Sequence, residues 1–392
     1  MKHLNRLTAL VACSFILLTG CSKETENAIR PSTVTQQSAQ LSASTRDKIN
    51  QLRAALPAGV EAKLKERSAL LLQTDQQYRD KVRNVLALEP TPCDSNTPSN
   101  QWLDQQLADW NNEVIGYALD FAMLDLPTYD ALIFENSSQN QTFGANGEYS
   151  QRLTKTFKDL QRFWNIQSAD IVLAAMHGNM LTNRDRIVRT YVAVYGVSPA
   201  TAGTLADIVT MLAAEVPQFR AGNHPIFTFN AFAQQGFSFP PYGTIPDKII
   251  MGDGILNAFT AIGYGDVAPQ AILAHEFGHQ IQFQLNLFET TQSPEATRRT
   301  ELMADAYSAY YLSHARGAAM QWKRVQQFLG VFFNIGDCSF TSDGHHGTPT
   351  QRLAAAQWGY NVANNAQKQG HILSSQEFTR LFEAQLPVFV KK

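Results

Sequence analysis

The sequence has few cysteines, no cluster of basic residues, and no long apolar run beyond its first 20 residues. Four cysteines among 392 residues are too few for a fold built on disulfides. Lysine and arginine form no cluster and the net charge is −2, so nucleic acid is not expected as a partner. No later stretch is apolar enough to span a bilayer. The hydrophobic content of 44% is enough for a large core, in two domains or in one elaborate domain.

The N-terminus has the features of a secretory signal. A positively charged start, "MKHLNR", precedes an apolar run over residues 7–18 that is too short to span a bilayer as a helix. The run ends in "LTGC", which resembles the lipobox of bacterial lipoproteins. The resemblance implies a signal peptide over 1–20, an acylated Cys21 as the only membrane anchor, and, from Ser22, a place at the periplasmic face of the outer membrane. The alternative is an ordinary signal followed by a stray cysteine.

The segment after the signal is expected to be a flexible tether. Export would also determine which cysteines remain available for a disulfide. Residues 21–45 are rich in Ser, Thr, Gln and Ala, which is typical of a flexible linker. Cys13 is lost with the signal and Cys21 carries the lipid, so Cys93 and Cys338 remain as a pair in an oxidising compartment. We expect a disulfide between them rather than two free thiols.

The rest of the chain is predicted to be mainly helical, of α+β class. Residues 46–166 have helical periodicity and no chemical motif, and they form an N-terminal helical region. Residues 167–392 form a second domain that mixes short strands with helices. Strands are expected in "DIVLAAM", "PIFTFNAFA" and "DKIIMGDGIL", and helices are expected over 183–195, 199–215, 268–287, 294–316, 319–334, from 349 and from 375.

The segment "LAHEFGHQIQ" combines two histidines with a glutamate on one predicted helix, for which Asp266 is the expected start. His275 and His279 are four residues apart, so both imidazoles point at one spot, where neutral ring nitrogens can bind zinc. Glu276 lies about 100° around the helix, where it can accept a proton from an attacking water. The alternative is a pair of histidines on the polar surface of a core helix.

A third ligand is expected on the next helix, which Ser293 caps and Gly317 ends. Glu301 and Asp305 are four residues apart and share a face of it. Glu301 completes a site of three ligands with one open position, and Asp305 can accept the free N–H of a ligand histidine. The alternative is a solvated helix face, but the apolar surroundings "ELMADAYSAYYL" favour burial, and buried carboxylates need partners.

These motifs resemble a known family of peptidases. Glu301, 22 residues after His279, and Asp305, four further on, resemble the gluzincin arrangement of thermolysin-type peptidases. The segments "ILAHEFGHQIQ", "RRTELMADAY" and "HHGTPTQR" are more similar to bacterial neutral zinc metallopeptidases. The resemblance covers residues 226–360 and implies a zincin-like core with a small sheet. It implies one zinc ion per chain on His275, His279 and Glu301, Glu276 as general base, and "DKIIMGDGI" as the edge strand above the site.

The residue that stabilises the oxyanion is left open by the sequence. The candidates are Tyr307, Tyr310, Tyr311, His345, His346 and Arg352. The two loop histidines precede a helix that Thr348, Pro349 and Gln351 are expected to start. One of them could instead occupy the open position of the metal as a gate, or both could simply face water.

The expected function is that of a zinc-dependent endopeptidase of the bacterial cell envelope, acting on a peptide or protein substrate. The main alternative is a zinc-containing assembly or binding lipoprotein of the envelope, with protein partners there and an idle or closed site. A weaker alternative is a metal-assisted hydrolase of a non-peptide amide. The presence of Glu276 favours catalysis, because a purely structural zinc site has no use for a base.

Overall fold

The computed structural model describes residues 41–71, 98–289, 293–335, 347–367 and 370–391, which belong to one compact unit. The expected signal peptide, most of the tether and the lipidation site Cys21 lie outside the described residues. So do Cys93, Cys338, His345 and His346, so the disulfide and the loop histidines stay predictions. None of the described helices is both long and apolar enough to cross a membrane.

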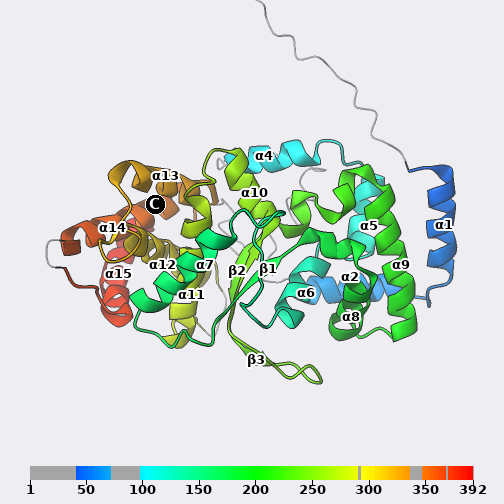
Figure 1. Ribbon diagram of the computed structural model, residues 1–392, viewed down its shortest axis with the longest axis horizontal. Coiled ribbons are helices and arrows are strands. Elements are labelled where there is room, and N and C mark those ends of the chain that lie inside the picture. Colours follow the sequence, from blue (N-terminus) through cyan, green and yellow to red (C-terminus); the bar gives the residue numbers. More distant parts are fainter. Residues whose placement is uncertain (1–40, 72–97, 290–292, 336–346, 368–369, 392) are drawn as a thin grey trace, which may run out of the picture. The chain divides into compact units, whose positions relative to one another are not determined.

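The described chain is mainly helical with a small sheet, as the sequence predicts (Figure 1). Its α-helices are α1 (Ala43–Ala54), α2 (Val60–Leu71), α4 (Pro98–Leu107), α5 (Asn112–Asp120), α6 (Leu126–Phe134), α7 (Ser150–Phe163), α8 (Arg184–Tyr195), α9 (Pro199–Glu215), α10 (Asp253–Ala261), α11 (Ala268–Gln284), α12 (Pro294–Ser313), α13 (Trp322–Ile335), α14 (Pro349–Gln367) and α15 (Ser375–Phe389). Short 3-10 helices are η1 (Gly178–Thr182), η2 (Pro217–Gly222) and η3 (Pro225–Thr228). The strands are β1 (Val172–Met176), β2 (Ala231–Gln234), β3 (Phe237–Ser238), β4 (Thr244–Ile245) and β5 (Lys248–Gly252).

Most predicted elements are present, and two predicted strands are shorter than expected. The first half of "PIFTFNAFA" forms η3, because Pro225 starts a turn whose Ile226 N–H donates to the preceding His224 side chain. Only the second half forms β2. The segment "DKIIMGDGIL" divides at Gly252, where β5 ends and α10 begins. Both errors arise where a turn interrupts a continuous apolar pattern.

The main sheet has the strand order β1-β5-β2. β1 pairs with β5 in parallel, with Val172 opposite Lys248, and β2 pairs with β5 antiparallel, with Ala231 opposite Met251. The expectation that β5 is the edge strand is therefore wrong, because β5 is central and β2 is the edge. The physical reason is that β2 returns and pairs with the second edge of β5; β1 is as fully buried as β5 and is still an edge strand, so burial does not predict the order.

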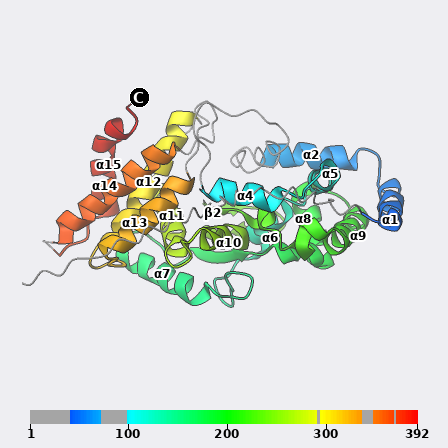
Figure 2. The same ribbon diagram turned by 90° about the horizontal axis from the view of Figure 1, so that it is seen from above.

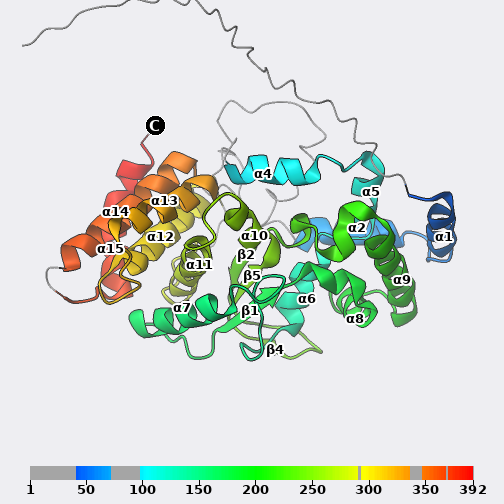
Figure 3. The same cartoon turned by 45° about the horizontal axis from the view of Figure 1, so that its top comes forward.

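The sheet separates two hydrophobic cores. Alternate residues of β1 face opposite cores: Ala174 packs into the first, and Leu173 and Ala175 pack into the second. Helices α1, α2, α5, α6, α8 and α9 lie to one side of the sheet, and α11 to α15 lie to the other (Figure 1, Figure 3). Helix α7 belongs to the second core although it precedes β1 in the chain. The domain boundary expected near residue 166 stays a prediction.

The two edges of the sheet differ in how they are covered. Side chains of the loop before α7 cap the outer edge of β1: Ser138 Oγ accepts from Leu173 N at 2.9 Å, and Gln141 Oε1 accepts from Ala175 N at 2.9 Å. These contacts occupy backbone N–H groups that could otherwise pair with another strand. No strand in the described part of the chain pairs with the outer edge of β2.

Candidate metal centre

Helix α11 carries the HEFGH motif and is buried almost all round. Pro269 lies in its first turn, and the N-cap position is Val267. Asp266, the expected start, lies one residue earlier, where its carboxylate pairs with Arg324 instead of capping the helix. Leu273, Phe277 and Ile281 are all fully buried, so the apolar ridge at four-residue spacing holds α11 in the second core.

Helix α12 brings the third candidate ligand close to α11. Ser293 caps it, as predicted, by accepting from Ala296 N at 3.1 Å. The two helices lie side by side (Figure 2). They approach most closely at Gly278, where an added Cβ would lie 3.0 Å from Ala304 Cα. The glycine inside HEFGH therefore sets the distance between the two histidines and Glu301.

His275, His279 and Glu301 converge on one point. The Nε2 atoms of the two histidines are 3.2 Å apart. Glu301 Oε2 lies 3.4 Å from His275 Nε2, and Glu301 Oε1 lies 3.3 Å from His279 Nε2. Their side chains are 6%, 12% and 11% exposed, so the cluster is sheltered and opens slightly at His279. The three predicted ligands form a buried group that can hold a metal ion.

The second ring nitrogen of each histidine, Nδ1, faces a hydrogen-bond acceptor. His275 Nδ1 lies 2.9 Å from Asp305 Oδ1, which is the contact predicted for Asp305. His279 Nδ1 lies 2.8 Å from Gln282 Oε1. The orientation of the Gln282 amide is fixed, because its Nε2 donates to Thr300 O at 2.7 Å. Both Nδ1 atoms therefore carry a proton, and both Nε2 atoms face the centre of the cluster, where a metal ion could displace any proton on them.

This arrangement fits a cation. Two Nε2 lone pairs 3.2 Å apart, facing a carboxylate, repel one another unless a positive charge lies between them. Burial lowers the pKa of His275, but the hydrogen bonds to Asp305 and Glu301 outweigh it and raise that pKa to about 10. The pocket thus binds positive charge strongly, whether a proton or a metal ion. Two imidazole nitrogens and one carboxylate oxygen are the donor set of a catalytic zinc site.

Arg352 completes the support behind the ligands. This arginine lies in the first turn of α14, which Thr348 and Gln351 open with the predicted reciprocal hydrogen bonds of 3.1 Å. The side chain is 2% exposed, and its Nε and Nη2 donate to Asp305 at 2.7 and 2.5 Å. Arg352 therefore contacts the acceptor on the Nδ1 side of His275, and its Nη1 also lies 3.7 Å from Glu301 Oε2, so its expected role as an oxyanion donor stays a prediction.

Glu276 is buried beside the cluster, with 6% of its surface exposed. Its carboxylate forms no hydrogen bond with any described residue. Burial raises the pKa of Glu276, and the neighbouring His275 and His279 partly oppose that rise. A carboxylate with a raised pKa and no fixed partner is suited to accept and return a proton.

The tyrosines considered as oxyanion donors are not near the cluster. Tyr307 is fully buried, and its hydroxyl bonds to Thr379 in α15. Tyr310 accepts from Leu373 N at 2.9 Å, and Tyr311 packs against Phe163. The physical reason is that all three lie in the second core, on the part of α12 that faces α7 and α15. The expectation for Tyr307 is therefore not supported.

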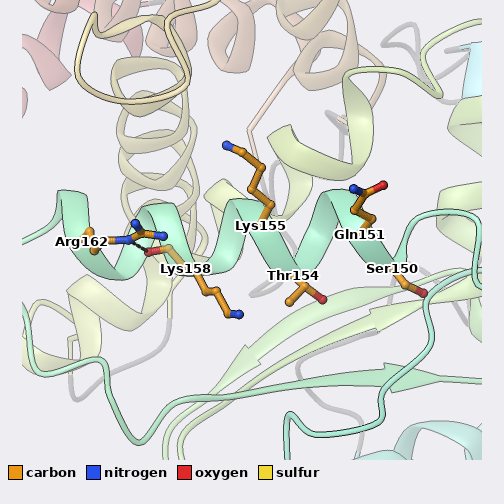
Figure 4. A pocket seen from close by; sticks show the side chains of 6 residues that line it. All are labelled: Ser150, Gln151, Thr154, Lys155, Lys158 and Arg162. Atoms are coloured by element: carbon orange, nitrogen blue, oxygen red, sulfur yellow. Dashed lines mark hydrogen bonds between the residues drawn. The ribbon is translucent and has the colours of Figure 1, made fainter.

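A shallow hollow elsewhere on the surface does not involve the metal cluster. Residues of α7 line it: Ser150, Gln151, Thr154, Lys155, Lys158 and Arg162 (Figure 4). Lys155 and Arg162 both pair with Asp159 on the same helix. The hollow is thus a solvated helix face on which one carboxylate is shared by two of the three cations.

Two residues of the site were missed in the sequence. Gln282 lies three residues after His279 on the same helix and is fully buried. A glutamine at this spacing from a candidate ligand is a signal for a supporting hydrogen bond. Gly278 occupies a variable position of the HExxH pattern, and only the packing of two helices reveals why a side chain there would clash.

No protein-family model matches the chain, no curated protein matches it, and no solved structure matches it. The family resemblance of the motifs therefore stays a prediction.

Proposed function

We propose that the protein is a zinc-dependent endopeptidase of the bacterial cell envelope, with a zincin-like core. The observation that carries this proposal is the convergence of two imidazole Nε2 atoms and the Glu301 carboxylate, beside the Glu276 carboxylate, which has no hydrogen-bond partner among the described residues. A structural zinc site normally has four protein ligands, whereas three ligands leave a position for a reacting water. The described residues supply three.

The ligands and their partners have distinct roles in this proposal. His275, His279 and Glu301 would hold one zinc ion, which when bound polarises the scissile carbonyl and acidifies the attacking water. Asp305 and Gln282 would hold the two imidazole rings in the orientation that binding needs, through the contacts at 2.9 and 2.8 Å. Arg352 neutralises Asp305, which otherwise would be a second buried carboxylate beside Glu301.

Glu276 is the proposed general base. It takes the proton of the attacking water at its carboxylate and then gives that proton to the leaving amine. Its position one residue after His275 places it beside the ligands rather than among them. Its raised pKa brings the carboxylate closer to the pKa of an activated water, which makes transfer in both directions feasible.

The open edge of β2 is the proposed place for the peptide substrate. Helix α11 packs against β2, and Gln280 Nε2 donates to Gln234 O at 3.3 Å and to Lys248 O at 2.7 Å, so the strand runs beside the metal-binding helix. The other edge of the sheet is capped by Ser138 and Gln141. A substrate that adds a strand to this sheet therefore has one edge available among the described strands.

Lipid anchoring at the outer membrane is part of the same proposal and rests on the lipobox resemblance at Cys21. In cells, Cys21→Ala should abolish acylation and release the exported protein from the membrane fraction. Retention of this variant in membranes washed with high salt would remove the lipid anchor from the proposal.

A single substitution tests the function. Glu276→Gln should retain one zinc ion per chain and the wild-type melting temperature, because Glu276 is not a ligand. Hydrolysis of casein should fall by at least about 100-fold through the loss of the base. Glu295→Gln, on the exposed first turn of α12, is the matched control and should hydrolyse casein at the wild-type rate.

Equal rates for wild type and Glu276→Gln would exclude the peptidase mechanism. Complementation of a deletion strain by Glu276→Gln would favour the alternative of a zinc-containing assembly lipoprotein. If wild-type protein purified without chelator contains no zinc, both the peptidase and the zinc-containing assembly lipoprotein are excluded.

A further inference from the structure

Helix α7 gathers basic residues that are dispersed in the sequence. It carries four basic residues and one acidic residue, whereas the whole chain has a net charge of −2. The basic residues follow one another at spacings of three or four, so the sequence shows no run of them, but the helix brings them towards one side. The protein therefore has a local excess of positive charge that its overall composition hides.

The two sides of α7 differ in composition. Leu153, Phe157 and Leu160 are buried in the second core, and the Phe157 ring lies 6.2 Å from the ring of Phe277 on α11. At about 100° per residue, the residues that line the hollow in Figure 4 fall within an arc of about 140° on the outward side, which contains three cations and no carboxylate. We call these residues the basic face: Ser150, Gln151, Thr154, Lys155, Lys158 and Arg162.

The charges of the basic face are only partly compensated. Asp159 lies at the rim of the arc, where its carboxylate is 2.6 Å from Lys155 Nζ and 3.2 Å from Arg162 Nη2. The side chains of Lys155 and Arg162 are 78% and 73% exposed, so water screens both pairs. Lys158 lies in the middle of the arc and forms no ion pair in the described part of the chain. The face therefore keeps a net positive charge.

The chemistry of the basic face fits a bilayer surface better than a protein or peptide partner. Its residues all carry polar or charged groups, and the exposed large apolar side chains of the described chain, Tyr242, Phe288 and Val388, lie elsewhere. A protein or peptide is normally held by aromatic or apolar anchors at the centre of the interface, which this face lacks. Long, exposed lysine and arginine side chains can instead reach mobile phosphate groups without a fixed docking geometry.

We propose that the basic face binds the anionic headgroups of a phospholipid bilayer. This proposal goes beyond the proposed function and does not depend on the metal cluster. Each basic residue near an anionic surface strengthens binding about fivefold, so three of them supplement a lipid anchor rather than replace it. Because α7 packs against α11, contact of the basic face with a bilayer sets the orientation of the metal-binding helix relative to the membrane.

The test measures co-sedimentation with vesicles. The protein is the exported chain carrying Cys21→Ala, so that no acyl chain contributes to binding. We expect it to bind vesicles that contain phosphatidylglycerol at low ionic strength and not to bind vesicles of phosphatidylcholine alone. High salt should release it, because salt screens exposed charges.

Substitutions on α7 should change this binding in both directions. Lys158→Gln should weaken it about fivefold, and the triple variant Lys155→Gln, Lys158→Gln and Arg162→Gln should weaken it about 100-fold. Asp159→Asn should strengthen it about fivefold, because this change removes the one carboxylate that the cations share. A variant that folds poorly would not show such a gain.

A matched control separates the basic face from the net charge. The triple variant Lys48→Gln, Lys63→Gln and Lys65→Gln changes the net charge by the same amount on α1 and α2, on the other side of the sheet, and should bind like its parent. Equal losses in the two triple variants would overturn the proposal. So would parent protein that binds no anionic vesicles, or that binds soluble polyglutamate in their place, which would assign the face to an acidic polypeptide.

The outcomes for the basic face and for the peptidase are distinguishable. Casein hydrolysis by wild type, combined with no binding to anionic vesicles, would refute the membrane contact and leave the peptidase intact. Vesicle binding that is lost in the α7 triple variant, combined with no casein hydrolysis by wild type, would refute the peptidase and retain the membrane contact.

Discussion

Gln282 accepts the Nδ1 proton of His279 at 2.8 Å and donates to Thr300 O at 2.7 Å, so one amide links the orientation of a ligand on α11 to the backbone of α12. The carboxylate of Asp305 has the corresponding role for His275. The two candidate ligand histidines are therefore fixed from opposite helices, one by a charged acceptor and one by a neutral acceptor.

Gln282→Leu should weaken zinc binding about 10- to 100-fold, because loss of the acceptor lets His279 rotate or change its tautomer. Competition with a chelating dye measures the affinity. Gln282→Glu keeps an acceptor at the same place and should retain more affinity than the leucine variant. The control is Gln270→Leu, at a partly exposed position in the first turn of α11, where the side chain donates to Asp266 O. Wild-type affinity in Gln282→Leu would show that the hydrogen bond does not position His279.

Gly278→Ala should destabilise the metal-free protein by about 1–3 kcal/mol, because the new methyl group would press against the backbone of Ala304. Urea unfolding measures this change. Gly116→Ala is the matched control: Gly116 also lies inside a helix, α5, but nothing lies within 4 Å of its added Cβ. That substitution should stabilise the protein by about 0.5–1 kcal/mol through helix propensity. Equal effects at the two glycines would contradict the close packing of α11 and α12.

Arg352→Met and Asp305→Leu should each destabilise the metal-free protein by about 3–5 kcal/mol, since each removes one side of a buried, hydrogen-bonded ion pair. The double variant should cost less than the sum, with a coupling on the order of 2 kcal/mol. Arg46→Met provides the surface comparison. Its pair with Glu113 has side chains 37% and 30% exposed, so this substitution should cost much less than either buried one. Additive losses at Arg352 and Asp305 would argue against a direct buried pair.

Stability should fall as the pH is lowered from 7.5 to 5.0, in part through His224. Burial lowers the pKa of His224 from 6.5 to about 4, and the hydrogen bond to Gln106 O opposes this only partly. Between pH 6.5 and 4, His224 is protonated in the unfolded chain but stays neutral in the folded chain. Acidification therefore favours the unfolded chain, and the free energy of unfolding falls as the pH drops below 6.5. At pH 5.0 the loss from this residue is about 2 kcal/mol.

His224→Asn removes the titrating group, and the difference between its urea stability and that of wild type should change by that amount over the same pH range. His371→Asn, at an exposed position, is the control. A pH-independent difference between wild type and His224→Asn would show that the buried ring is not the cause.

The sequence by itself determined the parts of the protein that depend on neighbouring residues. The helix starts at Ser293 and at Thr348 follow from capping interactions within one turn. The convergence of His275 and His279 follows from their four-residue spacing on a helix. The apolar surroundings of Glu301 and Asp305 indicated that both carboxylates are buried, and both are.

Only the tertiary structure decided how distant elements meet. β5 is central because β2 returns antiparallel to cover its second edge, which no local pattern specifies. Tyr307 faces Thr379, and Arg352 reaches Asp305, because α14 and α15 pack on α12 at angles set by whole faces of side chains. Local spacing fixes which residues share a face of a helix. The partner of that face depends on packing between residues far apart in the chain, and this is where Gln282 and Gly278 acquire their roles.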